Sequence, residues 1–217
     1  MIPLILVWLL RRYKISRRPP ALKFAYAFCF SLLWALSLSA QKKTIHYTVY
    51  HNGSEQGTLR LYENVESNIV RIRIESDVKM RILVMISVQT IEEAIFEKGI
   101  LVSSYLSRIV NGNEKVKQQV QATGFSYQLK ERSGTSQLPY YPIRASILWL
   151  YYTEPVGLRE VFSDNFQKYV PVEKVDSCRY RVKFPNGHEN YYTYHNGVCT
   201  KVEVDQSLFH LDFVLNE

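Results

Sequence analysis

Residues 178–204 read CRYRVKFPNGHENYYTYHNGVCTKVEV, which are three runs rich in Tyr, Val and Thr separated by two Asn-Gly pairs. Tyr, Val and Thr are enriched in β-strands. Both residues of an Asn-Gly pair tolerate the positive φ angles that a type I′ turn requires, so this dipeptide is a strong hairpin signal. The pattern predicts a three-stranded antiparallel meander, with strands near 178–184, 188–195 and 198–206.

The faces of this meander follow if both Asn-Gly turns are two-residue loops, because the loop length then sets the register of each strand pair. The alternation assigns two sets of side chains to opposite faces: Tyr180, Val182, Phe184, Tyr191, Thr193, Thr200, Val202 and Val204 to the core, and Arg179, Arg181, Lys183, Asn190, Tyr192, Tyr194, Lys201 and Glu203 to the outer surface.

The same register bears on Cys178 and Cys199. It places them on the two outer strands of the meander, about 10 Å apart, with side chains on opposite faces. A disulfide needs Cα atoms within about 7 Å of each other. We therefore expect no disulfide between Cys178 and Cys199, although an exported protein with two cysteines would form one by default. A shifted register would remove this argument.

The rest of the chain after residue 40 carries similar signals. Asn52-Gly53 and Asn111-Gly112 predict two more hairpins. Residues 70–75 alternate apolar and charged, as in a strand with one buried and one wet face, whereas residues 82–86 are apolar throughout and are expected to be covered on both sides. The further strands are expected near 43–50, 57–63, 68–76, 78–88, 91–97, 100–109, 114–121 and 124–130.

One segment breaks the β pattern. Ile143, Ile147 and Tyr151 recur at helical spacing between Pro142 and Pro155, which predicts a helix of about ten residues. A helix that is apolar on most of its surface must be buried, so we expect it on the concave side of a strongly curved, mainly antiparallel sheet or open barrel in an all-β fold. Either it fills the core or it lines a groove for an apolar ligand. The candidate lining residues are Ile143, Ile147, Leu148, Tyr151, Val182 and Tyr191.

The first 40 residues have the pattern of an export signal. They hold six basic and no acidic residues, and an uncharged apolar run of fifteen residues spans 24–38. This run is shorter than the roughly 20 residues that cross a bilayer. We expect a leader over 1–40, cleaved near residue 40, and a single β-rich domain over 41–217; the alternative is an uncleaved N-terminal anchor. The expected location is the periplasm or outer envelope.

Removing the leader changes the electrostatic interpretation. Six of the 27 basic residues lie in 1–40, so 21 remain against 20 acidic residues. A nearly neutral domain lacks the basic excess that marks nucleic-acid binders. We expect no nucleic-acid partner, and membrane contact only through the leader.

Catalytic and metal signatures are weak. The chain has no G-x-S-x-G, H-E-x-x-H or C-x-x-C motif. His188 and His195 lie seven positions apart on one predicted strand, which places them on opposite faces and is poor geometry for a metal. We expect no metal and no cofactor. Ser163, Asp164 and a distant His could form a hydrolase only if they converged in one cleft.

The outer face of the meander offers a second candidate site. Arg179, Arg181, Tyr192 and Tyr194 combine cations with aromatic rings, an arrangement that can bind an acidic polysaccharide or a lipid headgroup. The plainer interpretation is a solvated face with cross-strand Tyr and Arg pairs.

The C-terminal half also resembles a known family. The strings ILWLYYTEP at 147–155, VFS at 161–163, FPNG at 184–187 and NYYTY at 190–194, with the early strand from Tyr47 to Gly57, are similar to an uncharacterised family of exported β-rich proteins of Gram-negative bacteria. The resemblance covers most of residues 44–215 and implies no activity and no site residues. A curved sheet with a helix on its concave side is also similar, more remotely, to periplasmic lipoprotein-carrier folds, which hold acyl chains.

These observations favour an exported, non-enzymatic binding or carrier module for an apolar or lipid-like ligand. The alternative is a structural or interaction protein of the cell envelope, which would contact an envelope protein through a sheet edge or the Arg/Tyr face. A hydrolase is the third and least favoured expectation.

Overall fold

The computed structural model describes residues 41–139 and 141–216, which form fourteen strands and one short helix. The expected leader, residues 1–40, lies outside the described residues. The first eight strands are β1 (Gln41–His51), β2 (Ser54–Glu66), β3 (Ile69–Arg81), β4 (Met85–Glu97), β5 (Ile100–Val110), β6 (Asn113–Thr123), β7 (Ser126–Glu131) and β8 (Gly134–Leu138).

The remaining elements follow a long connection. They are α3 (Trp149–Tyr152), β9 (Glu160–Ser163), β10 (Lys168–Asp176), β11 (Arg179–Lys183), β12 (Glu189–His195), β13 (Val198–Gln206) and β14 (Phe209–Leu215).

All the strands belong to one antiparallel sheet. Its order is β8-β7-β6-β5-β4-β3-β2-β1-β14-β13-β12-β11-β10-β9, so the first and last strands of the described chain pair at its middle. The sheet is open, with β8 and β9 as its edges. The predicted fold class, an all-β curved sheet with one short helix on its concave side, is confirmed.

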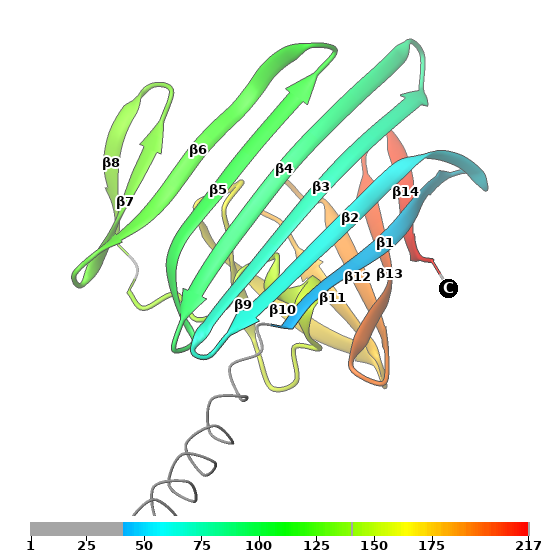
Figure 1. The fold of residues 1–217 in the computed structure, drawn as a ribbon. Helices are drawn as coiled ribbons and strands as arrows, with labels where there is room; N and C mark the ends of the chain where they lie inside the picture. The colour runs from blue at the N-terminus through cyan, green and yellow to red at the C-terminus, as the bar shows by residue number, and fades with distance from the viewer. Residues whose placement is uncertain (1–40, 140, 217) are drawn as a thin grey trace, which may run out of the picture. The chain divides into compact units, whose positions relative to one another are not determined.

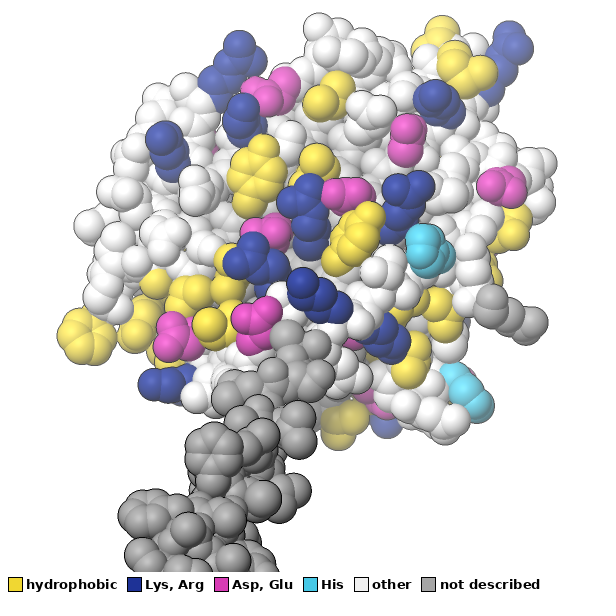
Figure 2. All heavy atoms as spheres, viewed as in Figure 1, with side chains coloured by type: hydrophobic (Ala, Val, Ile, Leu, Met, Phe, Trp, Pro, Cys, Tyr) yellow, Lys and Arg dark blue, Asp and Glu magenta, His cyan; other side chains and the backbone are white. Residues whose placement is uncertain are grey.

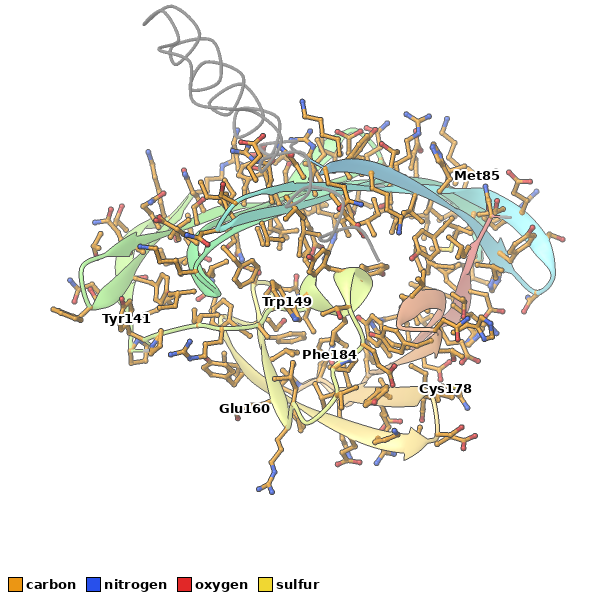
Figure 3. The ribbon with its side chains drawn as sticks, turned by 60° about the horizontal axis from the view of Figure 1, so that its bottom comes forward. Met85, Tyr141, Trp149, Glu160, Cys178 and Phe184 are labelled. Carbon is orange, nitrogen blue, oxygen red and sulfur yellow. The ribbon has the colours of Figure 1, made fainter. Side chains whose placement is uncertain are left out.

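The sheet curves back on itself, so that β1 to β8 face the later strands (Figure 1) and the helical turn at Trp149 lies between the two halves (Figure 3). The Tyr47 hydroxyl donates a 2.8 Å hydrogen bond to the Cys199 carbonyl oxygen, from β1 to β13. The ring of Tyr151 lies edge-on to the rings of Tyr47 and Tyr192, at 6.1 and 5.8 Å between centroids. Aromatic packing of this kind stabilises the contact between the halves.

Three of the four Asn-Gly pairs form the predicted two-residue hairpin turns. They join β1 to β2, β5 to β6, and β12 to β13, and Asn52, Asn111 and Asn196 all have positive φ. The positive φ at both turn positions is the type I′ requirement that Asn-Gly meets at low cost.

The fourth turn differs from the prediction. Lys183 pairs with Glu189, so five residues (184–188) separate β11 from β12 instead of two. This changes the register of β12 by one residue, which exchanges its two faces. Tyr192 and Tyr194 are therefore in the core and Tyr191 is on the outer side. A bulge between Thr193 and Tyr194 restores the predicted faces from Lys201 to Val204. Cys199, which the predicted register places on the outer face, is buried in the core instead.

The predicted ten-residue helix is also wrong in length, because only Trp149–Tyr152 is helical. The preceding backbone bonds to strands instead of to itself. Leu101 N donates to Ile143 O (2.8 Å), Phe162 N donates to Ala145 O, and Ile147 N donates to Phe162 O (both 2.9 Å). These bonds hold the segment extended and cover the free edge of β9.

Two other expectations about strands fail. The chain turns at residues 82–84, between β3 and β4, and not at the predicted breaks near 77 and 89. The apolar run 82–86 is thus a hairpin end in water and not a buried strand, with Leu83 91% exposed. The strands that the sequence did not predict are β8, β9, β10 and β14. Pro171 inside β10 weakened the strand signal there.

The two cysteines of the described chain are free thiols in different environments: Cys178 is exposed and Cys199 is buried. No helix within residues 41–139 and 141–216 is long and apolar enough to cross a membrane.

Candidate functional site

A cavity of about 390 Å³ lies between the two halves of the sheet. β2 to β5 form one wall, and β12 to β14 with the turn after β9 form the other. Its volume falls within the range of small-molecule pockets. It reaches the surface at one end, where the exposed residues Asn165 and Asn186 contribute to its rim.

Most of the lining is apolar. Alternate residues of each strand point inward, so Val78 and Met80 of β3 both face the cavity. Three phenylalanines of the opposite wall, Phe184, Phe209 and Phe213, face them across it. The cavity can therefore bury an apolar ligand from several sides.

One wall carries a charged pair. Glu92 on β4 and Arg108 on β5 both line the cavity, with Arg108 Nη2 3.7 Å from Glu92 Oε1. Arg108 Nη1 also donates a 3.2 Å hydrogen bond to Asn165 Oδ1. The side chains of Glu92 and Arg108 are 18% and 31% exposed. Burial raises the pKa of Glu92, and the positive charge of Arg108 opposes this rise.

Asp164 is a second carboxyl on the cavity, and unlike the half-buried Glu92 it is buried. It is 7% exposed, its carboxyl accepts a hydrogen bond from Ser104 Oγ, and its backbone carbonyl accepts one from Gln118 Nε2. Burial raises the pKa of Asp164 to about 7; the hydrogen bond from Ser104 opposes this rise and the nearby Glu92 adds to it. Asp164 therefore titrates near neutral pH, which is unusual for a carboxyl group and typical of functional clefts.

The residues of the possible hydrolase triad do meet at this cavity. Ser163, Asp164 and His188 all line it. However, the His188 ring lies within hydrogen-bond distance of Asn186 (2.9 Å) and Ser207 (3.0 Å), while Asp164 is engaged by Ser104. Among the described residues no hydrogen bond links the hydroxyl, the imidazole and the carboxyl, so the relay that activates a serine nucleophile is not formed.

Two of the six predicted lining residues face the cavity, namely Ile147 and Tyr151. The other four lie elsewhere: Ile143, Leu148 and Val182 are buried in the surrounding core, and Tyr191 is on the outer surface. The position of Tyr191 is a correction, and its cause is the five-residue turn before β12.

The predicted Arg/Tyr outer face needs the matching correction. Tyr192 and Tyr194 are 0% and 2% exposed, so neither belongs to a surface site. Arg179 and Arg181 are on the outer face, and the Arg179 guanidinium lies 4.4 Å from the centroid of the Tyr191 ring. The cation–aromatic pairing thus exists, with Tyr191 in place of its neighbours.

Acidic neighbours neutralise these two arginines. Arg179 Nη2 lies 2.7 Å from Glu203 Oε2, and Arg181 pairs with Glu173 and with Glu189 (3.6 Å for the latter). Figure 2 shows the same intermixing of basic and acidic side chains on the face formed by β1 to β6. Neither surface therefore presents a field of one sign that would attract an acidic polymer.

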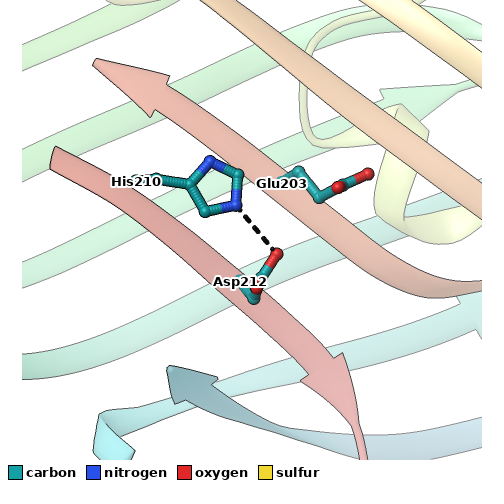
Figure 4. A group of neighbouring side chains, drawn as sticks. All are labelled: Glu203, His210 and Asp212. Carbon is teal, nitrogen blue, oxygen red and sulfur yellow. Dashed lines mark hydrogen bonds and ion pairs between the residues drawn. The ribbon is translucent and has the colours of Figure 1, made fainter. Parts of the chain in front are cut away.

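A small cluster on β13 and β14 has the side-chain types of a metal site. The ligand atoms of Glu203, His210 and Asp212 lie within 4.8 Å of one another (Figure 4). Lys201 Nζ already lies 3.4 Å from Glu203 Oε1 and 2.9 Å from Asp212 Oδ1. The Lys201 ammonium group therefore provides the positive charge between these carboxylates, and the cluster is an ion-pair network.

The side-chain alternation along β4 and β5 could have indicated the charged part of the cavity. Glu92 has the same strand parity as the core residues Ala94 and Phe96, and Arg108 has that of Leu106. A charged residue on the core side of a strand predicts a paired or functional group. Asp164 had no such signal, because the strands on either side of its turn were not predicted.

Comparison with known proteins identifies a family. No curated protein and no solved structure shows significant similarity to the chain. The family described as a domain of unknown function (DUF6134) matches residues 47–216, which is more than half of the 217 residues. The predicted resemblance to an uncharacterised family is thus confirmed at the level of the family. The chain belongs to the DUF6134 family of proteins of unknown function.

Proposed function

We propose that the chain is a non-enzymatic binding or carrier protein whose cavity takes an apolar, lipid-like ligand. The observation that carries this proposal is the cavity of about 390 Å³, lined mainly by apolar side chains, between the two halves of the sheet. Burial of apolar surface contributes roughly 25 cal/mol per Å². An acyl chain or a compact apolar molecule would gain most from such a lining.

The charged wall narrows the chemistry of the ligand. Glu92 and Asp164 place two carboxyl groups beside one guanidinium, that of Arg108. A ligand with an ionised acidic head would meet net repulsion there whenever Asp164 is ionised. We therefore propose a ligand with an apolar body and a neutral, hydrogen-bonding head, such as a hydroxyl or an amide.

The alternative, an envelope interaction protein, has less support. The arginines of the outer face are paired with acidic residues. The edge of β9 is covered by the backbone of 145–147, and the edge strand β8 is five residues long and mostly polar. Short, polar edge strands are those that proteins use to avoid pairing with other chains.

We further propose that the chain is exported to the periplasm or outer envelope of a Gram-negative cell. The support is the basic, acid-free segment before residue 24 and the apolar run after it. N-terminal sequencing of the protein recovered from fractionated cells should give a start near residue 41 in an envelope or periplasmic fraction. Recovery of the intact chain in the cytosol would contradict export.

The cavity proposal is tested with a fluorescent neutral lipid analogue, such as a pyrene-labelled monoglyceride, titrated into the purified full chain. Val88→Phe fills part of the cavity, whereas Ile91→Phe adds a ring on the opposite face of the same strand. We expect saturable binding to the parent and to Ile91→Phe, and about tenfold weaker binding to Val88→Phe. Equal binding by both variants would rule out the cavity as the site.

A further inference from the structure

The end of the β3–β4 hairpin is the most apolar exposed feature of the described chain. Leu83, Val84 and Met85 are 91%, 65% and 63% exposed, and they follow one another without a polar residue between them. A contiguous run of exposed apolar side chains is typical of a site that contacts a protein or a membrane. Figure 3 shows Met85 far from the helical turn at Trp149.

Residues close to this hairpin end line the cavity. Met80 and Val88, a few residues from the tip on β3 and β4, both line the cavity. The β13–β14 turn on the other half of the sheet exposes Leu208 (78%), and the next residue, Phe209, lines the cavity as well. Apolar turns of both halves of the sheet therefore lie within a few residues of the cavity lining.

Two cations accompany the tip. Lys79 and Arg81 are exposed on the outer face of β3, and neither makes an ion pair with any residue in the part of the chain that the structure describes. Along a strand, Arg81 lies about 7 Å and Lys79 about 13 Å from Leu83. The headgroup region extends about 5–8 Å beyond the hydrocarbon on each side. Arg81 therefore lies at headgroup level, and Lys79 lies above it but within about one Debye length, where an anionic surface still attracts it.

We propose that the β3–β4 hairpin end inserts into the surface of an anionic lipid bilayer. Leu83 and Val84 would enter the acyl boundary, Arg81 would contact headgroup phosphates, and Lys79 would be attracted by the anionic surface. The tip combines exposed aliphatic side chains with two cations that have no ion-pair partner in the described chain, and an anionic bilayer can accommodate both. A bilayer, which adapts to any apolar protrusion, matches it better than a protein pocket does.

The proposal adds a membrane contact to the one expected through the N-terminal leader. It would also bring the part of the cavity lined by Met80 and Val88 close to the bilayer, the source of an apolar molecule. The contact itself does not depend on the proposed ligand, and the two proposals can fail separately.

The test places a reporter at the tip of the full chain. Leu83→Trp is mixed with vesicles of phosphatidylglycerol brominated in the acyl chains, and the spectrum of the unsubstituted chain with the same vesicles is subtracted. We expect a blue shift and quenching of the signal from the introduced tryptophan. The matched control is Asn68→Trp in the β2–β3 turn at the opposite end of the strands, which should show neither.

The contribution of Lys79 and Arg81 is tested in the Leu83→Trp variant. Lys79→Ala with Arg81→Ala should raise the lipid concentration for half-maximal quenching by about tenfold or more, since each headgroup contact is lost. Lys42→Ala with Lys43→Ala, exposed at the start of β1, should leave it unchanged.

Three results would overturn the proposal. The first two are an unchanged fluorescence spectrum of Leu83→Trp on adding vesicles, and stronger quenching of Asn68→Trp than of Leu83→Trp. The third is a dimer on size exclusion whose formation, in place of vesicles, accounts for the blue shift of Leu83→Trp. Binding of the pyrene monoglyceride in vesicle-free solution should be the same for Leu83→Trp and the parent. If that binding is absent while the tip is quenched, the cavity proposal fails and the membrane proposal stands.

Discussion

The Tyr194 hydroxyl donates a 2.6 Å hydrogen bond to the backbone carbonyl oxygen of Leu150. Tyr194 is 2% exposed and Leu150 is 0% exposed, so the bond lies in the core and ties β12 to the helical turn. Burial raises the pKa of Tyr194 well above its ordinary value, which keeps the hydroxyl protonated as a donor. The bond forms only because the turn before β12 directs Tyr194 inward.

Tyr194→Phe should therefore destabilise the protein by about 1–3 kcal/mol, because the Leu150 carbonyl is left buried without a donor. The control is Tyr191→Phe, which removes a 2.7 Å hydrogen bond to Glu189 on the outer face, where water can replace it, and should cost about 0.5 kcal/mol or less. Urea unfolding of both variants gives the comparison. A larger loss for Tyr191→Phe would mean that the faces of β12 are reversed.

Gly57 is expected to tolerate no side chain. A Cβ at this position would lie 2.0 Å from the backbone oxygen of Asp77 on the neighbouring strand. Gly57→Ala must therefore push β2 and β3 apart, and we expect a loss of about 2–3 kcal/mol in unfolding free energy.

Gly53→Ala is the matched control for that change. Gly53 has a φ of +76° and open space around its Cβ position, so alanine would cost only the left-handed backbone penalty of about 1–2 kcal/mol. In thermal unfolding, the melting temperature of Gly57→Ala should be lower than that of Gly53→Ala. Equal melting temperatures would show that the two strands separate easily at Gly57.

The two cysteines should differ in reactivity. Burial raises the pKa of the Cys199 thiol to about 12, so almost no thiolate is available at neutral pH, and the side chain is also shielded. Cys178 is exposed. Peptide mapping after iodoacetamide treatment of the native protein should find Cys178 modified and Cys199 modified only in denaturant. A Cys178–Cys199 disulfide peptide without prior reduction would contradict this.

Asp164 should make stability fall as pH rises toward neutrality. Its folded pKa of about 7 exceeds the ordinary value of 3.8, so the folded state binds the proton more tightly than the unfolded state. The stabilisation is complete below about pH 4 and is lost as the pH rises through 7. In Asp164→Asn this loss is absent. Between about pH 4 and pH 7, the unfolding free energy of the variant should therefore rise by roughly 1–4 kcal/mol relative to that of the parent.

Ser104→Ala gives the second arm of that experiment. The Ser104 hydrogen bond favours the ionised carboxyl, so its removal should raise the pKa of Asp164 further and move the loss of stability to higher pH. Denaturant midpoints measured across this pH range provide the readout. Parallel pH profiles for the parent and Asp164→Asn would show that Asp164 does not titrate in this range.

Local sequence signals predicted most of the sheet correctly. Asn52-Gly53, Asn111-Gly112 and Asn196-Gly197 form the expected turns, and Ile72 and Ile74 face the core as their alternation indicates. Turn chemistry and side-chain alternation act over two to ten residues, so they can be recognised without knowledge of the rest of the fold. The antiparallel all-β class followed from them.

The sequence-based predictions were wrong in two situations. In one, a segment forms its backbone hydrogen bonds with a distant part of the chain. In the other, the length of a loop sets the register of the following strand. Ile143 to Ile147 have helical spacing, yet their backbone groups bond to Leu101 and Phe162. Asn186-Gly187 lies inside a longer loop, in which the Asn186 side chain accepts a 3.2 Å hydrogen bond from His188 N. Neither effect is visible in a local pattern.

Short stretches of residues thus determined where most strands lie and which turns connect them. The faces of β12, the length of the helix and the convergence of Glu92, Arg108 and Asp164 on one cavity depended on the assembled molecule. The physical reason is that a strand has a period of two, so a single-residue change in register exchanges inside and outside. The cavity exists only because β4 and β5 are brought to face β12 to β14, from which they are far removed in sequence.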